Sequence, residues 1–411
     1  PYMNEHGVIM GETTIGQRNE LRTTEGIFYI ETLQILALQR AKTAREAIQV
    51  MGSLAEEYGY RDGGECLTVG DQYEMWFFEI LPSGPLNKGA IWAAVRIPEG
   101  HVGVSANRSR IGELKKNNPD YMFSSNVFDL AIQNGWWDPA SGKPFLFYEA
   151  YADKTSMGSR RREWRVLSTF APSLNLDPNA SRFPFTVKAE KKITVQDYFT
   201  IYRDTYVGTA YDKANVSDWF VPDSKGVYVK SPFATPHMSS DFLKLVDAAS
   251  ERNIAIPGCS YFTVLQSRSW LDPKIGTLCW FGLNNPDTSV HVPVYAGVSY
   301  LPQNFAVNDR TKFSMTNRVS AWWAFDFVDQ LVNQRYQDCI NDVKAVRDPF
   351  EAQQFAMQPT IEKVASDLMK VDPKLAIGFL TSYTNSRCVM AVDMYWKLAE
   401  DLIVKYDDKW F

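Results

Sequence analysis

The chain lacks the residue patterns that identify many common enzyme and membrane classes. Its 411 residues contain no apolar run of about 18 residues, so no segment is predicted to span a bilayer. No G-x-G-x-x-G, G-x-x-x-x-G-K-[ST] or G-x-S-x-G sequence is present. This removes the usual signatures of dinucleotide binding, phosphate binding and serine hydrolysis. Such general motifs therefore do not identify a function.

Cysteine and histidine are also scarce. The 5 cysteines include no C-x-x-C pair and the 4 histidines include no H-E-x-x-H pair. This spacing favours neither a zinc site nor a redox pair, and single cysteines are most often small buried residues. A metal site would need residues from distant parts of the sequence, and we predict none.

Charge and composition limit the possible partners. The formal net charge is -5, with acidic and basic residues interspersed and no basic stripe that would neutralise phosphates. We therefore predict no nucleic-acid partner. Apolar residues make up 45% of the chain and aromatic residues 14%, which is enough to bury a large core and is typical of a folded globular protein.

The first third alternates between strand and helix patterns. Val8 to Ile15 predicts a strand, and apolar residues recur at helical spacing from Ile27 to Gln39. Thr43-Ala44-Arg45-Glu46 matches a capping box that opens a second helix, which Gly59 ends. An antiparallel meander is then predicted from strands at 66–70, 74–81, 90–96 and 102–106.

The rest of the chain is less regular and then helical. From about 117 to 236 the sequence is irregular and rich in aromatic residues, and it predicts short helices and long loops. Further helices are predicted from 318 to 346, from a cap at Asp348-Pro349, and from about 386 to 405. Strands are predicted at 260–266, 277–283 and 292–298. We predict an α+β protein of one domain over 1–411, with two sheets packed face to face and helices outside.

Short segments along the whole chain carry a more specific signal. Each is weak alone, but their order from one end of the chain to the other is specific. The segments are Asn4-Glu5-His6-Gly7-Val8, 11–14, 64–71 with Trp76 and Glu79, 104–113, 233–236, 260–268, 276–282, and 380–383 with Trp396. Taken together they resemble the C69 dipeptidases.

The resemblance implies an N-terminal nucleophile hydrolase with a four-layer αββα sandwich of two antiparallel sheets, distantly related to penicillin V acylases and bile salt hydrolases. In such enzymes a cysteine at the processed N-terminus attacks the amide carbonyl. Its α-amino group, with a pKa of about 8, relays the proton, and no cofactor is needed. Residue 1 is Pro1, which has no thiol. We therefore expect the first strand and the nucleophile upstream of Pro1, and an inactive homologue is the alternative.

Five residues are predicted to support this chemistry. Asn107 would hold the oxyanion, or would merely cap the following turn. Thr13 and Thr14 lie where the related acylases place a second oxyanion donor, although ordinary strand threonines fit equally well. Arg162 and Arg165 match the acylases' Ser-Arg-x-x-Arg element. Arg162 would orient the nucleophile and Arg165 would bind a substrate carboxylate, with a solvated charge run as the alternative.

The sequence thus predicts a cysteine-type dipeptidase that acts on short peptides. One alternative is an N-acyl amide hydrolase of the penicillin V acylase or bile salt hydrolase type, since a fold does not fix its substrate. Another is a catalytically inactive binding or surface homologue. We expect small peptides as partners, a possible homo-oligomer, and a secreted, periplasmic or envelope location in a bacterium, with the cytoplasm as alternative.

Overall fold

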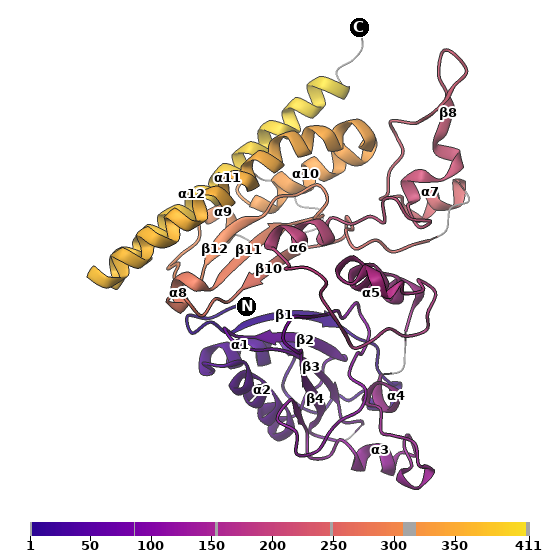
Figure 1. Cartoon of the computed structure of the whole chain (residues 1–411), viewed down its shortest axis with the longest axis vertical. Coiled ribbons are helices and arrows are strands. Elements are labelled where there is room, and N and C mark those ends of the chain that lie inside the picture. Colours follow the sequence, from indigo (N-terminus) through magenta and orange to yellow (C-terminus); the bar gives the residue numbers. More distant parts are fainter. Residues whose placement is uncertain (1, 86, 153–154, 247–249, 307–317, 408–411) are drawn as a thin grey trace. The chain divides into compact units, whose positions relative to one another are not determined.

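The computed structural model describes residues 2–85, 87–152, 155–246, 250–306 and 318–407 (Figure 1). The chain divides into two compact units. The first combines Pro1–Ile193 with Leu265–Thr277, and the second combines Thr194–Val264 with Leu278–Phe411. The predicted single domain over 1–411 stays a prediction, and the irregular stretch from about 117 to 236 runs from the first unit into the second.

The first unit is built on a five-stranded antiparallel sheet with the strand order β1-β2-β3-β4-β6. Thr13 lies opposite Cys66, which lies opposite Glu79, so these three residues form a row across one face. The strands are β1 (Ile9–Thr14), β2 (Glu65–Gly70), β3 (Met75–Pro82), β4 (Ala90–Arg96) and β6 (Tyr121–Phe123). The predicted strand at 102–106 is wrong in extent: β5 (His101–Gly103) is shorter and pairs with β7 (Thr186–Lys188) outside this sheet.

Two helices, α1 (Ile30–Arg40) and α2 (Ala44–Tyr58), cover the sheet face that carries Leu67, Val69 and Phe78. The cap at Thr43 is confirmed, because its hydroxyl accepts from the backbone N–H of Glu46 at 3.2 Å. The reciprocal half of the box differs from the prediction, since the Glu46 carboxylate accepts from the N–H of Lys42 at 2.7 Å. Gly59 follows the helix with φ 86°, a conformation that favours glycine.

The opposite face of the sheet packs on a second core, which includes Cys66, Phe77 and Ala93. The short helices α3 (Asp129–Gln133) and α4 (Phe147–Tyr151) contribute to this core. The helix α5 (Met157–Phe170) packs Leu167 and Phe170 against Val102 and Val187 of the β5–β7 pair. The apolar side of α5 therefore packs on that strand pair, and the arginine side chains of α5 form their contacts elsewhere.

The second unit contains a three-stranded sheet in the order β10-β11-β12, with β11 and β12 antiparallel. The sheet's core side packs against three long helices. The strands are β10 (Tyr261–Gln266), β11 (Leu278–Leu283) and β12 (Val292–Tyr295). Smaller elements are α6 (Val195–Tyr202), the hairpin of β8 (Phe220–Pro222) and β9 (Tyr228–Lys230), α7 (Ser240–Leu245) and α9 (Gln303–Ala306), while α8 (Pro273–Gly276) belongs to the first unit.

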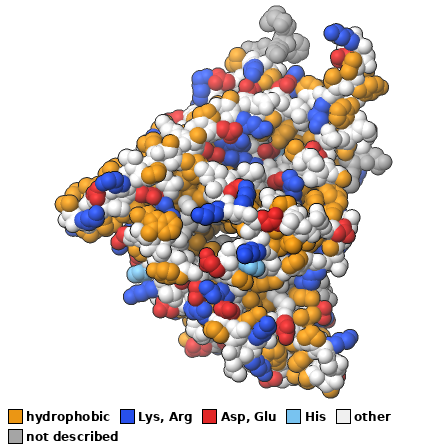
Figure 2. All heavy atoms as spheres, in the orientation of Figure 1, with side chains coloured by type: hydrophobic (Ala, Val, Ile, Leu, Met, Phe, Trp, Pro, Cys, Tyr) orange, Lys and Arg blue, Asp and Glu red, His pale blue; other side chains and the backbone are white. Residues whose placement is uncertain are grey.

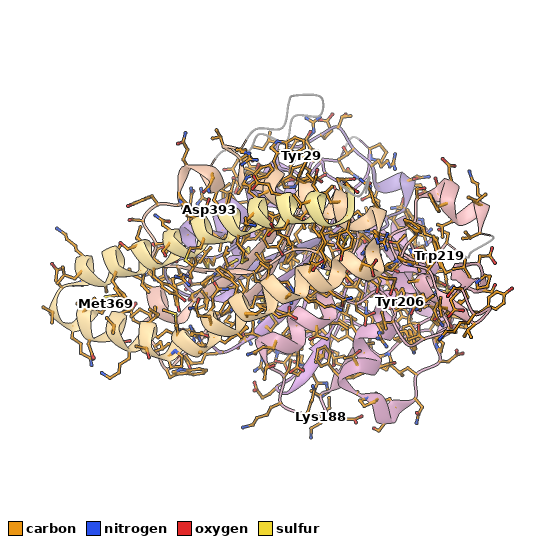
Figure 3. The ribbon with its side chains drawn as sticks, turned by 90° about the horizontal axis from the view of Figure 1, so that it is seen from above. Tyr29, Lys188, Tyr206, Trp219, Met369 and Asp393 are labelled. Carbon is orange, nitrogen blue, oxygen red and sulfur yellow. The ribbon has the colours of Figure 1, made fainter. Side chains whose placement is uncertain are left out.

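The long helices correct the predicted boundaries. The helix predicted from 318 to 346 is interrupted at Arg335, between α10 (Ala321–Gln334) and α11 (Tyr336–Val371). Asp348-Pro349 does not open a helix, because Pro349 lies inside α11. A second Asp-Pro pair, Asp372-Pro373, does begin a helix. Asp372 caps α12 (Pro373–Leu402) by accepting from the N–H of Lys374 at 2.9 Å. Figure 3 shows α11 and α12 side by side, with Met369 near the turn that joins them.

Charged side chains of both signs are interspersed on the surface, as they are along the sequence. Figure 2 shows Lys, Arg, Asp and Glu side chains mixed over the face in view. Among the helices of the described residues, none combines the length and apolar character that a membrane crossing requires.

Candidate active site

Asn107 lies on the loop after β5, and its side chain reaches the end of β1. Its amide nitrogen Nδ2 donates to the carbonyl oxygen of Thr14 at 2.9 Å and to the hydroxyl of Thr13 at 3.2 Å. Asn107 has φ 61°, a left-handed conformation that asparagine tolerates better than most residues. Asn107 and Thr13 are half-buried and Thr14 is exposed, so solvent reaches this point.

Arg162 of α5 fixes the orientation of this amide. Its Nη1 and Nη2 donate to Oδ1 of Asn107 at 3.0 and 3.1 Å, and Nη2 also donates to the carbonyl of Ala106 at 3.1 Å. Its Nε donates to the carbonyl of Gly158 at 3.0 Å. A guanidinium can only donate. Asn107 must therefore turn its oxygen toward Arg162 and its two amide hydrogens toward the end of β1.

Glu79 holds the loop that carries Asn107. Its side chain is 0% exposed, and Oε1 accepts from the backbone N–H groups of Arg110 at 2.6 Å and Ile111 at 3.2 Å. Its Oε2 accepts from the hydroxyl of Ser109. Burial raises the pKa of Glu79, and these hydrogen bonds oppose that shift. In the sequence Glu79 served only as part of a family resemblance; its position inside an apolar strand is the signal for a buried, hydrogen-bonded carboxyl.

The cysteine thiols are not activated. Burial raises the pKa of Cys66 and Cys279, and it raises the pKa of Cys259 to about 11 and those of Cys339 and Cys388 to about 12. Nucleophilic cysteines have lowered pKa values. All five are free, and all but Cys259 are buried, as predicted for structural cysteines.

Buried arginines surround Glu163 of α5. The Oε2 of Glu163 lies 2.5 Å from Nη1 of Arg110 and 3.3 Å from Nη1 of Arg108. The three side chains are at most 2% exposed. Burial raises the pKa of Glu163 and lowers that of Arg108. The sequence did not predict this network, because the buried partner of these arginines lies more than 50 residues away.

The second unit has a separate buried polar cluster at His291. The Nδ1 atom of His291 and Nη2 of Arg203 lie 3.0 and 2.6 Å from Oε1 of Glu351. The imidazole stacks on Phe199 with ring centroids 3.4 Å apart. Burial lowers the pKa of His291 to about 4. Burial would raise the pKa of Glu351, but Arg203 and His291 hold it well below its usual value.

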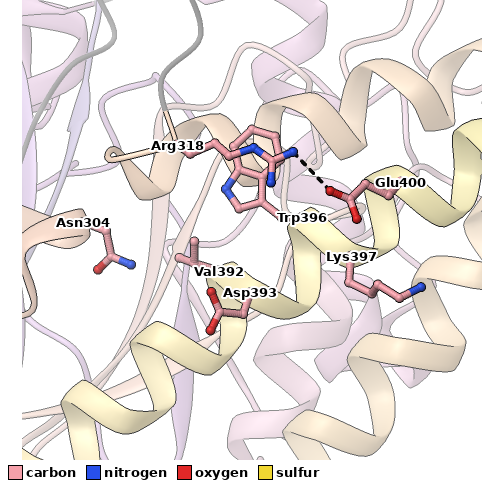
Figure 4. Close-up of a pocket in the computed structure, with 7 residues that line it drawn as sticks. All are labelled: Asn304, Arg318, Val392, Asp393, Trp396, Lys397 and Glu400. Carbon is pink, nitrogen blue, oxygen red and sulfur yellow. Dashed lines mark hydrogen bonds and ion pairs between the residues drawn. The ribbon is translucent and has the colours of Figure 1, made fainter.

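The second unit also contains a pocket of about 350 Å³. In this pocket, shown in Figure 4, Arg318 lies 3.1 Å from the Glu400 carboxylate and 4.7 Å from the centre of the Trp396 ring. None of the predicted site residues lines it; the lining residues are Asn304, Arg318, Val392, Asp393, Trp396, Lys397 and Glu400. Over the residues that the structure describes, no group of three or more His, Cys, Asp or Glu side chains is placed to hold a metal ion.

The structure thus brings together Thr13, Thr14, Asn107 and Arg162 from three separate segments. Within the described chain, the hydrogen bonds of the Asn107 side chain go to β1 and α5. Arg165, half-buried and nearly one turn further along α5, is not a hydrogen-bond partner of Asn107. The catalytic roles, and the substrate-binding role of Arg165, stay predictions.

The protein has mixed α and β structure with antiparallel sheets. The amide of Asn107, held by the guanidinium of Arg162, hydrogen-bonds the end of the edge strand β1. The family model described as "Peptidase family C69" matches residues 1–348, and the chain belongs to this family. The resemblance read from the sequence is therefore confirmed.

Relatives with curated names agree with the family. The chain is 25% identical to a "Probable dipeptidase" of Salmonella dublin over 276 residues, which are 66% of this chain and 55% of the relative. It is 32% identical to "Probable dipeptidase B" of Lactococcus lactis subsp. lactis (strain IL1403) over 44% of this chain and 38% of the relative. It is 22% identical to "Probable dipeptidase A" of Streptococcus pyogenes serotype M3 (strain SSI-1) over 81% and 64%. The matches span between about two fifths and two thirds of these relatives.

Proposed function

We propose that the protein is a dipeptidase that hydrolyses short peptides through a cysteine at the N-terminus of the mature protein, upstream of Pro1. Three observations support this: membership of family C69, the relatives named as probable dipeptidases, and the Thr13–Asn107–Arg162 arrangement. The third observation carries the proposal, because it supplies a neutral donor in a fixed orientation at a solvent-accessible strand end.

In the proposed reaction the cysteine sulfur attacks the carbonyl carbon of the peptide bond. The thiol proton passes to the α-amine of the same residue and then to the departing amine of the substrate. Water hydrolyses the resulting thioester and regenerates the thiol. An α-amine suits this relay because its usual pKa is about 8, near the working pH.

Asn107 would stabilise the negative oxygen of the tetrahedral intermediate. Of its two Nδ2 hydrogen bonds, the one to Thr13 is the longer at 3.2 Å and is the one that an oxyanion would replace. Arg162 would act as a positioning residue, since its two N–H groups on Oδ1 prevent the amide from flipping. Thr13 and Thr14 would define the place of the oxyanion at the end of β1.

The layered architecture is part of the proposal. Each unit carries long helices on one face of its sheet, α1 and α2 in the first and α10 to α12 in the second. We propose that the two sheets form the inner layers of an αββα sandwich of the N-terminal nucleophile hydrolase type. A crystal structure of the mature protein would test this layering.

The decisive experiment identifies the first residue of the mature protein and its substrate. N-terminal sequencing of the purified active protein should give cysteine, and alkylation of that residue should abolish hydrolysis of a dipeptide panel. Activity on acyl amides without activity on dipeptides would instead favour an N-acyl amide hydrolase. A different first residue, together with no hydrolysis, would mean an inactive binding homologue.

The role of Asn107 is tested by Asn107→Asp, which keeps the oxygen for Arg162 and replaces the donor by a negatively charged acceptor. We expect kcat to fall by about 10²–10³, the usual cost of one lost oxyanion donor. Asn117→Asp is the matched control, because Asn117 is an exposed asparagine with φ 59° in the same unit. Equal kcat values for the two variants would refute the oxyanion role.

A further inference from the structure

In the first unit, arginine side chains donate hydrogen bonds to the backbone carbonyl groups of residues 178–184. These donors come from α5 and from the loop after β5, so both elements form hydrogen bonds with the same segment. The bonds are Arg161 to Pro178 at 2.8 Å, Arg160 to Asn179 at 3.2 Å and Ala180 at 3.1 Å, Arg108 to Ser181 at 2.8 Å, and Arg110 to Phe183 at 3.4 Å and to Pro184.

Arg182 lies in the middle of this segment and differs from the four donors. It is half-buried, and its guanidinium carbon lies 3.1 Å from the centre of the Tyr148 ring. Among the residues that the structure describes, its guanidinium has no hydrogen-bond acceptor, although it offers five N–H groups. The buried Nε atoms of Arg108 and Arg110 also lack an acceptor.

Positive charge exceeds negative charge around Arg182. Burial, followed by the charges of Arg108 and Arg110, lowers the pKa of Arg182 to about 10, and Glu163 opposes this shift. Glu163 shares its Oε2 between Arg108 and Arg110. The carboxyl of Glu79 is engaged by Ser109 and two backbone N–H groups. Uncompensated charge in a buried setting is costly, so a counter-ion is expected here.

We propose that Arg182, with Arg108 and Arg110 beside it, forms a binding site for a small anion or carboxylate. A planar guanidinium with unused donors and one face held by an aromatic ring is suited to that ligand chemistry. The ligand would be either a free anion, such as chloride or acetate, or the terminal carboxylate of a peptide. Only the second source rests on the proposed dipeptidase activity.

Thermal unfolding with increasing sodium chloride or sodium acetate tests the site. Wild-type protein should show a saturable rise of a few degrees in Tm, because a ligand that binds only the folded state stabilises it. Arg182→Gln should lose this component and keep the general salt effect. Arg182→Lys, which keeps the charge, should bind about tenfold more weakly. Arg61→Gln is the matched control, since exposed Arg61 also lies over a tyrosine ring, that of Tyr29, at 5.5 Å.

The two sources are separated with a dipeptide and its C-terminal amide. If the substrate carboxylate binds, Arg182→Gln raises KM for the dipeptide about tenfold or more and leaves KM for the amide unchanged. If only a free anion binds, the variant loses the Tm response and both KM values stay equal to wild type. If Arg182→Gln and Arg182→Lys both keep the saturable response, the site does not exist. A protein without peptidase activity would refute the proposed function but leave the Tm test intact.

Discussion

The carboxyl of Glu79 links the sheet to the loop that carries Asn107, because it accepts hydrogen bonds from two backbone N–H groups of that loop. A smaller side chain could not reach these N–H groups. Glu79→Ala should leave the N–H groups of Arg110 and Ile111 without acceptors and destabilise the protein by about 2–4 kcal/mol. Glu79→Gln keeps the accepting oxygen and can donate to Ser109, so it should cost much less. Urea unfolding measures both values.

Glu79→Gln also tests a positioning role. Since the pKa of Glu79 is raised by burial, its contribution to stability is fully present at low pH and is lost as pH rises through that pKa. Glu79→Gln removes this dependence, so the stability and the kcat of the variant should fall less than those of the wild type as pH rises. An unchanged pH profile together with full activity in Glu79→Ala would contradict the role.

The residues of the candidate site differ in how far the sequence revealed them. Asn107 and Arg162 lie in short segments with a specific resemblance, so their roles were predicted and their proximity is now observed. Glu79 and Glu163 were not predicted to support the site, because their function depends on partners that fold next to them. Local patterns do not report which distant donors will surround a buried carboxyl.

At the scale of single helices, close packing opposes helix propensity at Gly52 of α2. A Cβ atom there would lie 2.4 Å from the Trp92 ring, whereas a Cβ atom at Gly378 of α12 would meet nothing within 4 Å. Gly52→Ala should therefore destabilise the protein by about 1–3 kcal/mol. Gly378→Ala should stabilise it by about 0.5–1 kcal/mol. Denaturant unfolding compares the two, and a gain at both positions would show that α2 is not in close contact with the sheet.

Pro359 is an exposed residue inside α11, where it removes one helical hydrogen bond. Pro359→Ala should raise stability by about 1–2 kcal/mol, because the gain in helix propensity exceeds the loss of proline's restraint on the unfolded chain. Thermal unfolding measures this effect. Thr360→Ala, a change at the exposed neighbour, should give a smaller increase, and equal shifts would mean that Pro359 carries no specific cost.

Helix boundaries show why the sequence predicted some elements better than others. Thr43 and Gly59 act through their own backbone neighbours, and α2 begins and ends where they predict. Asp348-Pro349 carries the same kind of local signal, yet α11 continues through it, because Val343 and Phe350 on either side are buried against α10 and α12. Tertiary packing outweighed the local preference at that point.

Across the whole molecule, two buried clusters should respond to pH in opposite directions. Burial, with Glu12 next, raises the pKa of Glu65 to about 9, so its stabilising contribution is lost as pH rises above about 4.5 toward 9. Around His291 the shifts are reversed. His291, with a pKa near 4, favours folding with the imidazole neutral, and this contribution is lost as pH falls from about 6.5 toward 4. The lowered pKa of Glu351 favours folding with the carboxylate ionised, and this contribution is lost only as pH falls below about 4.5.

Hydrogen exchange measured near about pH 5, 7 and 9 should resolve these two effects, once the rates are corrected for intrinsic exchange. At acid pH we expect protection to fall around Glu351 in α11 and in β12, while the β1–β2 pair remains protected. At alkaline pH the β1–β2 pair, which carries Glu65, should lose protection first. Glu65→Gln should remove the alkaline loss, and Glu20→Gln, a change at an exposed glutamate of the same unit, should not.

Either a uniform loss of protection at both extremes or the reverse order would contradict the assignment of these clusters. The site residues give this result a functional meaning, since Thr14 lies directly opposite Glu65 in the β1–β2 register. Ionisation of Glu65 would therefore loosen the strand end to which Asn107 donates. Activity should then decline at alkaline pH together with β1 protection, and Glu65→Gln should restore both.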